Sequence, residues 1–110
     1  MIKRMSLLTR KDGIDDAEFD RRWLIQHAAI VRQVQGVAGY VQNRVRQGTA
    51  GGSSIDGLAE LWFADAATMD RVLASPDWQK VVADAREFVG TVTSLTVEEH
   101  TVVTTPRPGQ

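Results

Sequence analysis

Two amphipathic helical stretches, each flanked by strand-like segments, constrain the fold of this chain more than any other feature of its sequence. Residues 15–34 and 65–89 carry apolar side chains at the three- and four-residue intervals typical of helices with one buried face. Four further segments have the alternation and residue types of β-strands: 2–10, 37–47, 57–64 and 92–104. The predicted order is therefore strand, helix, strand, strand, helix, strand.

Local signals mark the ends of the predicted helices. Asp15 stands three residues before a glutamate and Asp65 follows the third strand, so each is a candidate N-cap. Ser75, directly before a proline, restarts the second helical stretch. Gly36 and Gly90 are placed to end the two stretches.

This element order is the split β-α-β arrangement of ferredoxin-like folds. We therefore expect an α+β fold, βαββαβ, with a four-stranded antiparallel sheet and its helices on one face. A chain of 110 residues suits one domain, expected over residues 1–104 and followed by a flexible tail at 105–110. The segment 47–56, rich in glycine and serine, is predicted to be a mobile loop that could act as a lid.

The sheet face away from the helices is predicted to be mixed in character. Alternation along the strands assigns Tyr40, Gln42, Glu60 and Trp62 to it. A face that combines aromatic area with polar groups is typical of a contact surface. We therefore expect a homodimer.

Composition excludes several classes of function. Thirteen Lys and Arg against 14 Asp and Glu give a net charge of −1, so no global field recruits nucleic acid or an anionic membrane. Tyr40, Arg44 and Arg46 could suggest RNA binding, but the third strand lacks the basic and aromatic pattern that such a sheet needs. The apolar run 5–8 is too short for a signal peptide or a membrane span, so a cytoplasmic protein is expected.

Cofactor and metal sites have no visible ligands in the sequence. The chain has no cysteine and only two histidines, His27 and His100. These residues give no zinc ligand set, and no Gly-rich phosphate cradle opens a helix. We expect the domain to work without a metal or a cofactor.

His27 is the main candidate for chemistry. Helical periodicity places this titratable ring on the inward face, one turn after Trp23. A histidine there is either a structural residue satisfied by a backbone carbonyl or a functional group open to a pocket, and Trp23 alone is most simply a core residue. Periodicity leaves both interpretations open.

Several motifs resemble one known family. The segment Phe19-x3-Trp23-x3-His27-Ala28, then Gly36-x3-Tyr40, is similar to EthD-type members of the dimeric α+β barrel superfamily. The later segments Trp62-Phe63-x-Asp65, Ser75-Pro76-Asp77 and Asp84-x3-Phe88 resemble the second half of those proteins. The resemblance thus covers most of residues 2–103.

The resemblance implies a homodimer whose sheets pack face to face, with a pocket between sheet and helices in each subunit. It implies that His27 lines this pocket, as the matching histidine does in methylmuconolactone methylisomerases, fungal anthrone decarboxylases and polyketide cyclases. With the resemblance included, His27 is predicted to be catalytic, and Trp23, Tyr40, Asp84 and Phe88 to bind the substrate. An exposed helix acid remains the alternative for Asp84, and His100 is expected to be a solvated residue of the last strand.

Three functions stay open at this point. The first is a cofactor-independent isomerase, decarboxylase or cyclase that moves a proton on a small cyclic, aromatic or lactone substrate. The second is a non-catalytic protein that binds a small apolar ligand or supports an oxygenase. The third is a cofactor-free or haem-using monooxygenase. The family's founding member is linked to bacterial ether degradation, which names no substrate for this chain.

Overall fold

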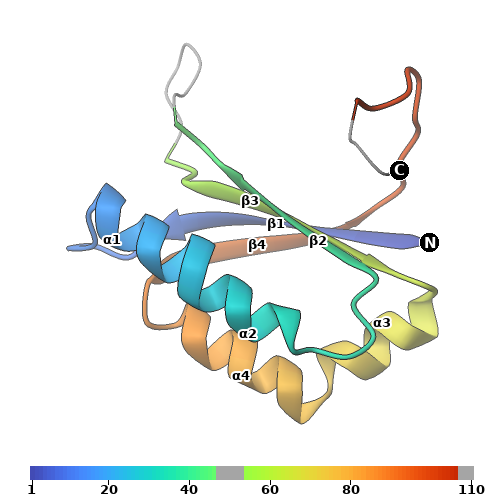
Figure 1. The fold of residues 1–110 in the computed structure, drawn as a ribbon, viewed down its shortest axis with the longest axis horizontal. Coiled ribbons are helices and arrows are strands. Elements are labelled where there is room, and N and C mark those ends of the chain that lie inside the picture. The colour runs from blue at the N-terminus through green and yellow to red at the C-terminus, as the bar shows by residue number, and fades with distance from the viewer. Residues whose placement is uncertain (47–53, 107–110) are drawn as a thin grey trace.

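The computed structural model describes residues 1–46 and 54–106, and Figure 1 shows the arrangement of the elements. The elements, in chain order, are β1 (Ile2–Arg10), α1 (Asp16–Asp20), η1 (Arg21–His27), α2 (Ala28–Arg32), β2 (Gly39–Arg44), β3 (Gly57–Phe63), α3 (Ala66–Leu73), α4 (Pro76–Ala85) and β4 (Val89–Val97). The predicted order of strands and helices is confirmed. Residues 47–53 of the predicted lid loop and 107–110 of the predicted tail lie outside the described part of the chain.

The four strands form one antiparallel sheet in the order β2-β3-β1-β4. The helices lie on one face of this sheet (Figure 1), where η1 and α2 pack side by side with α4. This is the predicted ferredoxin-like α+β fold. No helix in the described residues is both long enough and apolar enough to cross a membrane.

The predicted helix caps are present. The Asp15 carboxylate accepts a hydrogen bond from the Glu18 amide at 2.8 Å, and the Asp65 carboxylate accepts one from the Thr68 amide at 2.7 Å. The Ser75 hydroxyl accepts from the third amide of α4 in the same way. These bonds satisfy amides that a helix N-terminus leaves unpaired, so the caps fix where the helices begin.

Several predicted element ends are wrong. The last strand begins at Val89 and ends at Val97 instead of spanning 92–104. Val97 already pairs with Lys3, next to the first residue of β1, so the described residues after Val97 extend past the end of that strand. The second strand is likewise shorter than 37–47. Gly90 lies inside β4 and does not end the helix; a Cβ there would be 2.8 Å from the Arg10 carbonyl oxygen, so a close strand approach requires the glycine.

The first helical stretch is not one continuous α-helix. Residues Arg21–His27 form a π-helix between two α-helical segments. Four residues of an α-helix turn through about 400°, so side chains spaced by four shift around the helix by about 40° at each step. A π-helix, with its i→i+5 hydrogen bonds, has more residues per turn and reverses this shift. Four residues spaced by four therefore stay on the buried face: Phe19, Trp23, His27 and Val31.

One face assignment made from alternation is wrong. Tyr40 pairs with Leu61 and Gln42 with Ala59, so both side chains lie on the helix-covered face and not on the opposite face with Glu60 and Trp62. Residues directly opposite one another in an antiparallel pair share a face. Alternation gives each strand a period of two but no phase relative to its neighbour, and the register of β2 against β3 supplies that phase.

The helix-free face holds a buried ion pair. Lys3 Nζ lies 2.7 Å from Glu60 Oε1 and 4.8 Å from the Trp62 ring centroid. Glu99, which follows β4, accepts a second bond from Lys3 at 2.7 Å. Asn43 donates to the other Glu60 oxygen at 3.0 Å. This face is therefore polar at its centre, which agrees with the mixed aromatic and polar character predicted for it.

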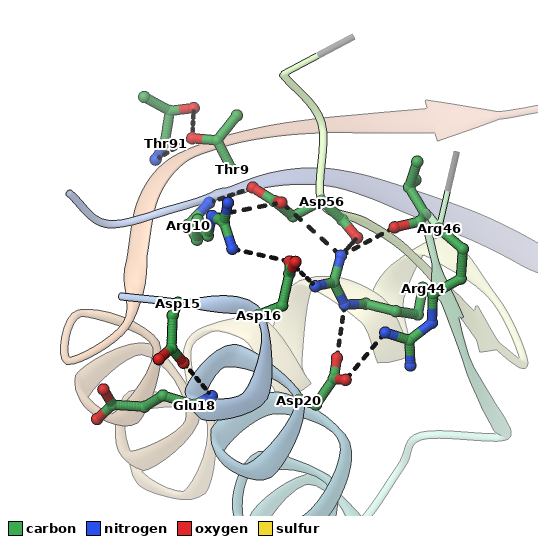
Figure 2. A network of polar contacts seen from close by, with 11 residues as sticks. Thr9, Arg10, Asp15, Asp16, Glu18, Asp20, Arg44, Arg46, Asp56 and Thr91 are labelled. Carbon is green, nitrogen blue, oxygen red and sulfur yellow. Dashed lines mark hydrogen bonds and ion pairs between the residues drawn. The ribbon is translucent and has the colours of Figure 1, made fainter. Parts of the chain in front are cut away.

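A network of charges anchors the start of the first helical stretch to the sheet (Figure 2). Arg44 at the end of β2 bonds Asp20 at 2.6 Å and Asp16 at 2.9 Å, and its guanidinium lies over the Phe19 ring. Arg10 at the end of β1 bonds Asp16 at 2.8 Å, and its amide donates to Asp56 ahead of β3. The network thereby sets the position of η1 and of the residues that η1 carries.

Candidate functional site

A cavity of about 400 Å³ lies between the sheet and the helices. Its walls come from all four strands and from η1, α2 and α4, and most of the lining side chains are apolar, Leu8, Val31, Leu61 and Val81 among them. A smaller set of lining residues is polar: Arg4, Ser6, Trp23, His27, Tyr40, Arg86 and Ser94. Small-molecule sites commonly combine apolar walls with a few converging polar groups.

Trp23 forms the fully buried part of this wall. Its six-membered ring packs against Gly57, where an added Cβ would lie 2.5 Å from ring atoms, so the indole needs a glycine opposite it. The Trp23 carbonyl accepts a bond from Gln42 Nε2 at 2.8 Å, and the same nitrogen lies 3.0 Å from the Tyr40 hydroxyl. The Trp23 indole N–H is buried and finds no hydrogen-bond partner among the residues that the structure describes.

His27 ends η1 and is 7% exposed. Its Nδ1 lies 2.8 Å from Asp84 Oδ2 on α4, and the ring meets Phe88 edge-on at 5.5 Å between centroids. An ionised carboxylate can only accept, so Nδ1 carries the proton and Nε2 of the neutral ring is the free acceptor. With Nδ1 occupied by Asp84, Nε2 is the nitrogen left for a ligand in the cavity that His27 lines.

Burial lowers the pKa of His27 below its ordinary value of 6.5, and the Asp84 carboxylate opposes this shift without cancelling it. The ring is therefore neutral at pH 7. A neutral imidazole with its second nitrogen held by a carboxylate is oriented as a general base, because the carboxylate also stabilises the imidazolium that forms when the base takes a proton.

Burial raises the pKa of Tyr40 to about 12, while the side chains of Gln42 and Trp23 act in the opposite direction. The indole N–H is thus close enough to influence the Tyr40 hydroxyl, although it does not reach hydrogen-bond geometry. The hydroxyl stays protonated at neutral pH. It can therefore donate a hydrogen bond to a ligand oxygen.

The predicted site residues divide into two groups. Trp23, His27 and Tyr40 line the cavity. Asp84 and Phe88 contact the His27 ring but do not line the cavity themselves. The partner of His27 is a carboxylate and not the backbone carbonyl that the structural interpretation expected. His100 lies beyond the end of β4, 74% exposed and 2.6 Å from Glu98, so its predicted place on the last strand is wrong, and it does not line the cavity.

Four polar residues that line the cavity were not predicted as site residues from the sequence: Arg4, Ser6, Arg86 and Ser94. Ser6 and Ser94 face each other across β1 and β4, with their hydroxyl oxygens 2.9 Å apart. Alternation from Leu8 along the first strand would have placed Arg4 and Ser6 on the inward face. The described residues include no group of three or more metal-ligating side chains positioned to hold an ion.

Fold and site together define a class: a ferredoxin-like α+β protein with a histidine-bearing cavity under its helices. The chain belongs to the EthD domain family, whose sequence model matches residues 11–91. An uncharacterized 11.0 kDa protein from the thcB-thcC intergenic region of Rhodococcus erythropolis is 31% identical over 90 residues. The match covers 81% of this chain and 87% of that protein.

Solved structures share the fold at lower identity. An EthD family protein from Bacillus halodurans superposes with a TM-score of 0.77 at 21% identity, over 91% of this chain and 100% of that one. A dimeric ferredoxin-like protein of unknown function from Thermobifida fusca gives 0.70 at 10% identity, covering 87% and 88%. SnoaB, a cofactor-independent oxygenase from Streptomyces nogalater, gives 0.64 at 16% identity, covering 93% and 97%.

Proposed function

We propose that this chain is a cofactor-independent enzyme that transfers a proton on a small cyclic or aromatic carbonyl compound, with His27 as the base. The observation that carries this proposal is the His27–Asp84 pair at the wall of a mostly apolar cavity. A neutral histidine held by a partly buried carboxylate is suited to take a proton from carbon next to a carbonyl. An apolar cavity of about 400 Å³ suits a compact ring system.

The proposed chemistry assigns a role to each residue around the ring. His27 Nε2 removes the proton, and Asp84 stabilises the imidazolium that results. The Tyr40 hydroxyl donates to the carbonyl oxygen as negative charge develops on it, because its high pKa keeps it protonated. Return of the proton to another carbon gives isomerisation, and attack of the carbanion on an electrophilic carbon of the same ligand gives cyclisation. In a decarboxylation His27 takes the proton of the carboxylic acid instead, loss of CO2 forms the carbanion, and the imidazolium returns the proton to that carbon.

A cofactor-independent oxygenase is the second candidate, supported by the structural likeness to SnoaB. Both candidates form a carbanion in the cavity, and they differ in whether this carbanion then reacts with dioxygen. A ligand-binding protein without catalysis is the third outcome. The same experiment distinguishes all three.

The homodimer is part of the proposal. The dimeric structural relative supports it, as does the helix-free sheet face with its polar centre. Leu95 of β4 lies on this face, 49% exposed and opposite Met5. We propose that a second copy of the chain covers this face.

Hydrogen–deuterium exchange at carbon tests the proposed function even while the product is unidentified. A panel of cyclic ketones, anthrones and unsaturated lactones is incubated with the protein in D2O, and exchange next to the carbonyl is followed by NMR with an oxygen electrode alongside. We expect the wild type and His100→Asn to accelerate exchange of at least one compound and His27→Asn to lose that acceleration. Oxygen consumption would show that the protein is an oxygenase. Binding of a compound without exchange would show that it is a ligand-binding protein without catalysis.

A further inference from the structure

Arg4 is a charged residue on the inward face of the central strand β1. It pairs with Leu61 of β3 on one side and Thr96 of β4 on the other, so its side chain lies on the helix-covered face with Ser6 and Leu8. All three of these β1 residues line the cavity. A guanidinium therefore stands at the wall of a mostly apolar cavity.

Nothing in the described part of the chain compensates this charge. Arg4 Nε is buried and has no hydrogen-bond partner, and no described carboxylate forms an ion pair with Arg4. The other arginines of β1 and β2 behave differently: Arg10 and Arg44 are both held by aspartates. Partial desolvation of a cation without a partner costs free energy, so a group of this kind in a cavity is a candidate for binding a ligand.

The position of Arg4 along the sheet also fits the proposed base. Trp23 packs against Gly57, and Gly57 pairs with Leu8 of β1. Val31 belongs to the same core cluster as Leu61, and Leu61 pairs with Arg4 of β1. His27 lies midway between Trp23 and Val31 on the helix. It is therefore placed between the levels of Leu8 and Arg4, about two strand residues or ~7 Å along β1 from Arg4.

We propose that Arg4 binds a carboxylate of the ligand, so that the cavity takes small cyclic or aromatic acids and presents their ring carbons to His27. The role given to His27 rests on the proposed function, whereas carboxylate binding by Arg4 does not. A guanidinium binds a carboxylate through two parallel hydrogen bonds. It therefore selects for a negatively charged ligand and also fixes the ligand's orientation. The Ser6 and Ser94 hydroxyls lie on the same face of the sheet as Arg4, two residues further along β1 and on the paired position of β4.

Binding of 1-naphthoate and of its neutral analogue 1-naphthamide tests this proposal, with tryptophan fluorescence as the readout because Trp23 and Trp78 line the cavity. We expect the wild type to bind the acid at least about 10-fold more tightly than the amide. Arg4→Met should abolish this preference, and Arg4→Lys should keep part of it. The melting temperature of Arg4→Met should be unchanged or raised, since an uncompensated charge is removed.

Controls separate this proposal from its alternatives. Arg71→Met removes one charge from the exposed side of α3 and should leave the preference intact. His27→Asn should also keep it, so failure of carbon exchange and failure of carboxylate recognition are distinguishable. A preference that survives in Arg4→Met and disappears in Arg86→Met would place the anion at the exposed rim and overturn the proposal. Dissociation of Arg4→Met into monomers would overturn it too, because the partner of Arg4 would then be a carboxylate of a second copy.

Discussion

His27 Nδ1 and Asp84 Oδ2 lie 2.8 Å apart, although 57 positions separate the two residues in the chain. The bond joins η1 to α4 across the helix layer, and both residues are largely buried. It fixes the tautomer of the imidazole and leaves Nε2 as its acceptor. The bond is therefore the feature on which the proposed proton transfer depends.

The titration of His27 should follow from this environment. Because burial lowers its pKa, the ring should titrate below 6.5 in NMR spectra, and Asp84→Asn should move the midpoint lower still by removing the group that opposes burial. As the pH falls below 6.5, His27 of the unfolded chain takes up a proton before His27 of the folded protein does. His27 therefore favours the folded state above pH 6.5, and this contribution to stability is lost as the pH falls toward the pKa of the folded protein. His100→Asn assigns the resonances, and an upward shift in Asp84→Asn would contradict the account.

The contact between Gly57 and Trp23 should be intolerant of a methyl group. Gly57→Ala puts a Cβ 2.5 Å from a fully buried ring, so the indole must shift; we expect a loss of about 1–3 kcal/mol of stability and a changed tryptophan emission. Gly39→Ala is the matched control in β2, where the new Cβ meets Trp62 at 3.1 Å. Equal effects of the two variants in urea unfolding would show that Trp23 is free to move.

Arg44 should contribute more to stability than its neighbour Arg46. Arg44 is 8% exposed and bonds Asp16 and Asp20, so Arg44→Met removes two charge-assisted hydrogen bonds of a buried cation and should cost about 2–3 kcal/mol. Arg46 is 62% exposed, and Asp20 is its one ion-pair partner in the described part of the chain, so Arg46→Met should cost less than about 1 kcal/mol. Similar losses in chemical denaturation would mean that the network in Figure 2 does not anchor α1.

The pKa of Asp20 gives the same network a pH signature. The hydrogen bond from Arg44 holds this pKa below its ordinary value of 3.8. The network therefore stabilises the fold above about pH 4, and its contribution is lost as the pH falls through the folded pKa. The acid destabilisation of Arg44→Met should accordingly be shallower than that of the wild type.

The dimer should depend on the helix-free face. Leu95→Glu places a charge on that face and should shift the protein from about twice the 12.1 kDa of one chain to a monomer in light scattering. Ile25→Glu, at an equally apolar residue that is 67% exposed on η1, should leave the dimer intact. A monomeric wild type at low micromolar concentration would contradict the proposal.

The sequence predicted the fold because local signals agreed with one another. Asp15, Asp65 and Ser75 cap helices where capping chemistry indicated, and Gly36 adopts the positive φ expected after a helix. The last strand was placed too far along the chain because propensity does not report whether a partner strand is present. Tyr40 was assigned to the wrong face since alternation lacks the register between strands.

The site was predictable only in part. Helical spacing placed Trp23 and His27 on a buried face, and the family resemblance pointed to Asp84 and Phe88. The bond between His27 and Asp84 depends on how two helices pack, which spacing within either helix does not determine. Arg4 was missed because a single arginine near the start of a strand carries no motif.

The most direct test of the central claim is His27→Asn, measured for both rate and stability on a substrate found by the exchange panel. Asparagine keeps a polar group of similar size but cannot act as a base, so we predict a rate loss of about 100-fold or more with the fold intact. A purely structural histidine would behave in the opposite way, with turnover retained and stability reduced by about 1–3 kcal/mol because Asp84 loses its partner. An active but destabilised His27→Asn would contradict the account.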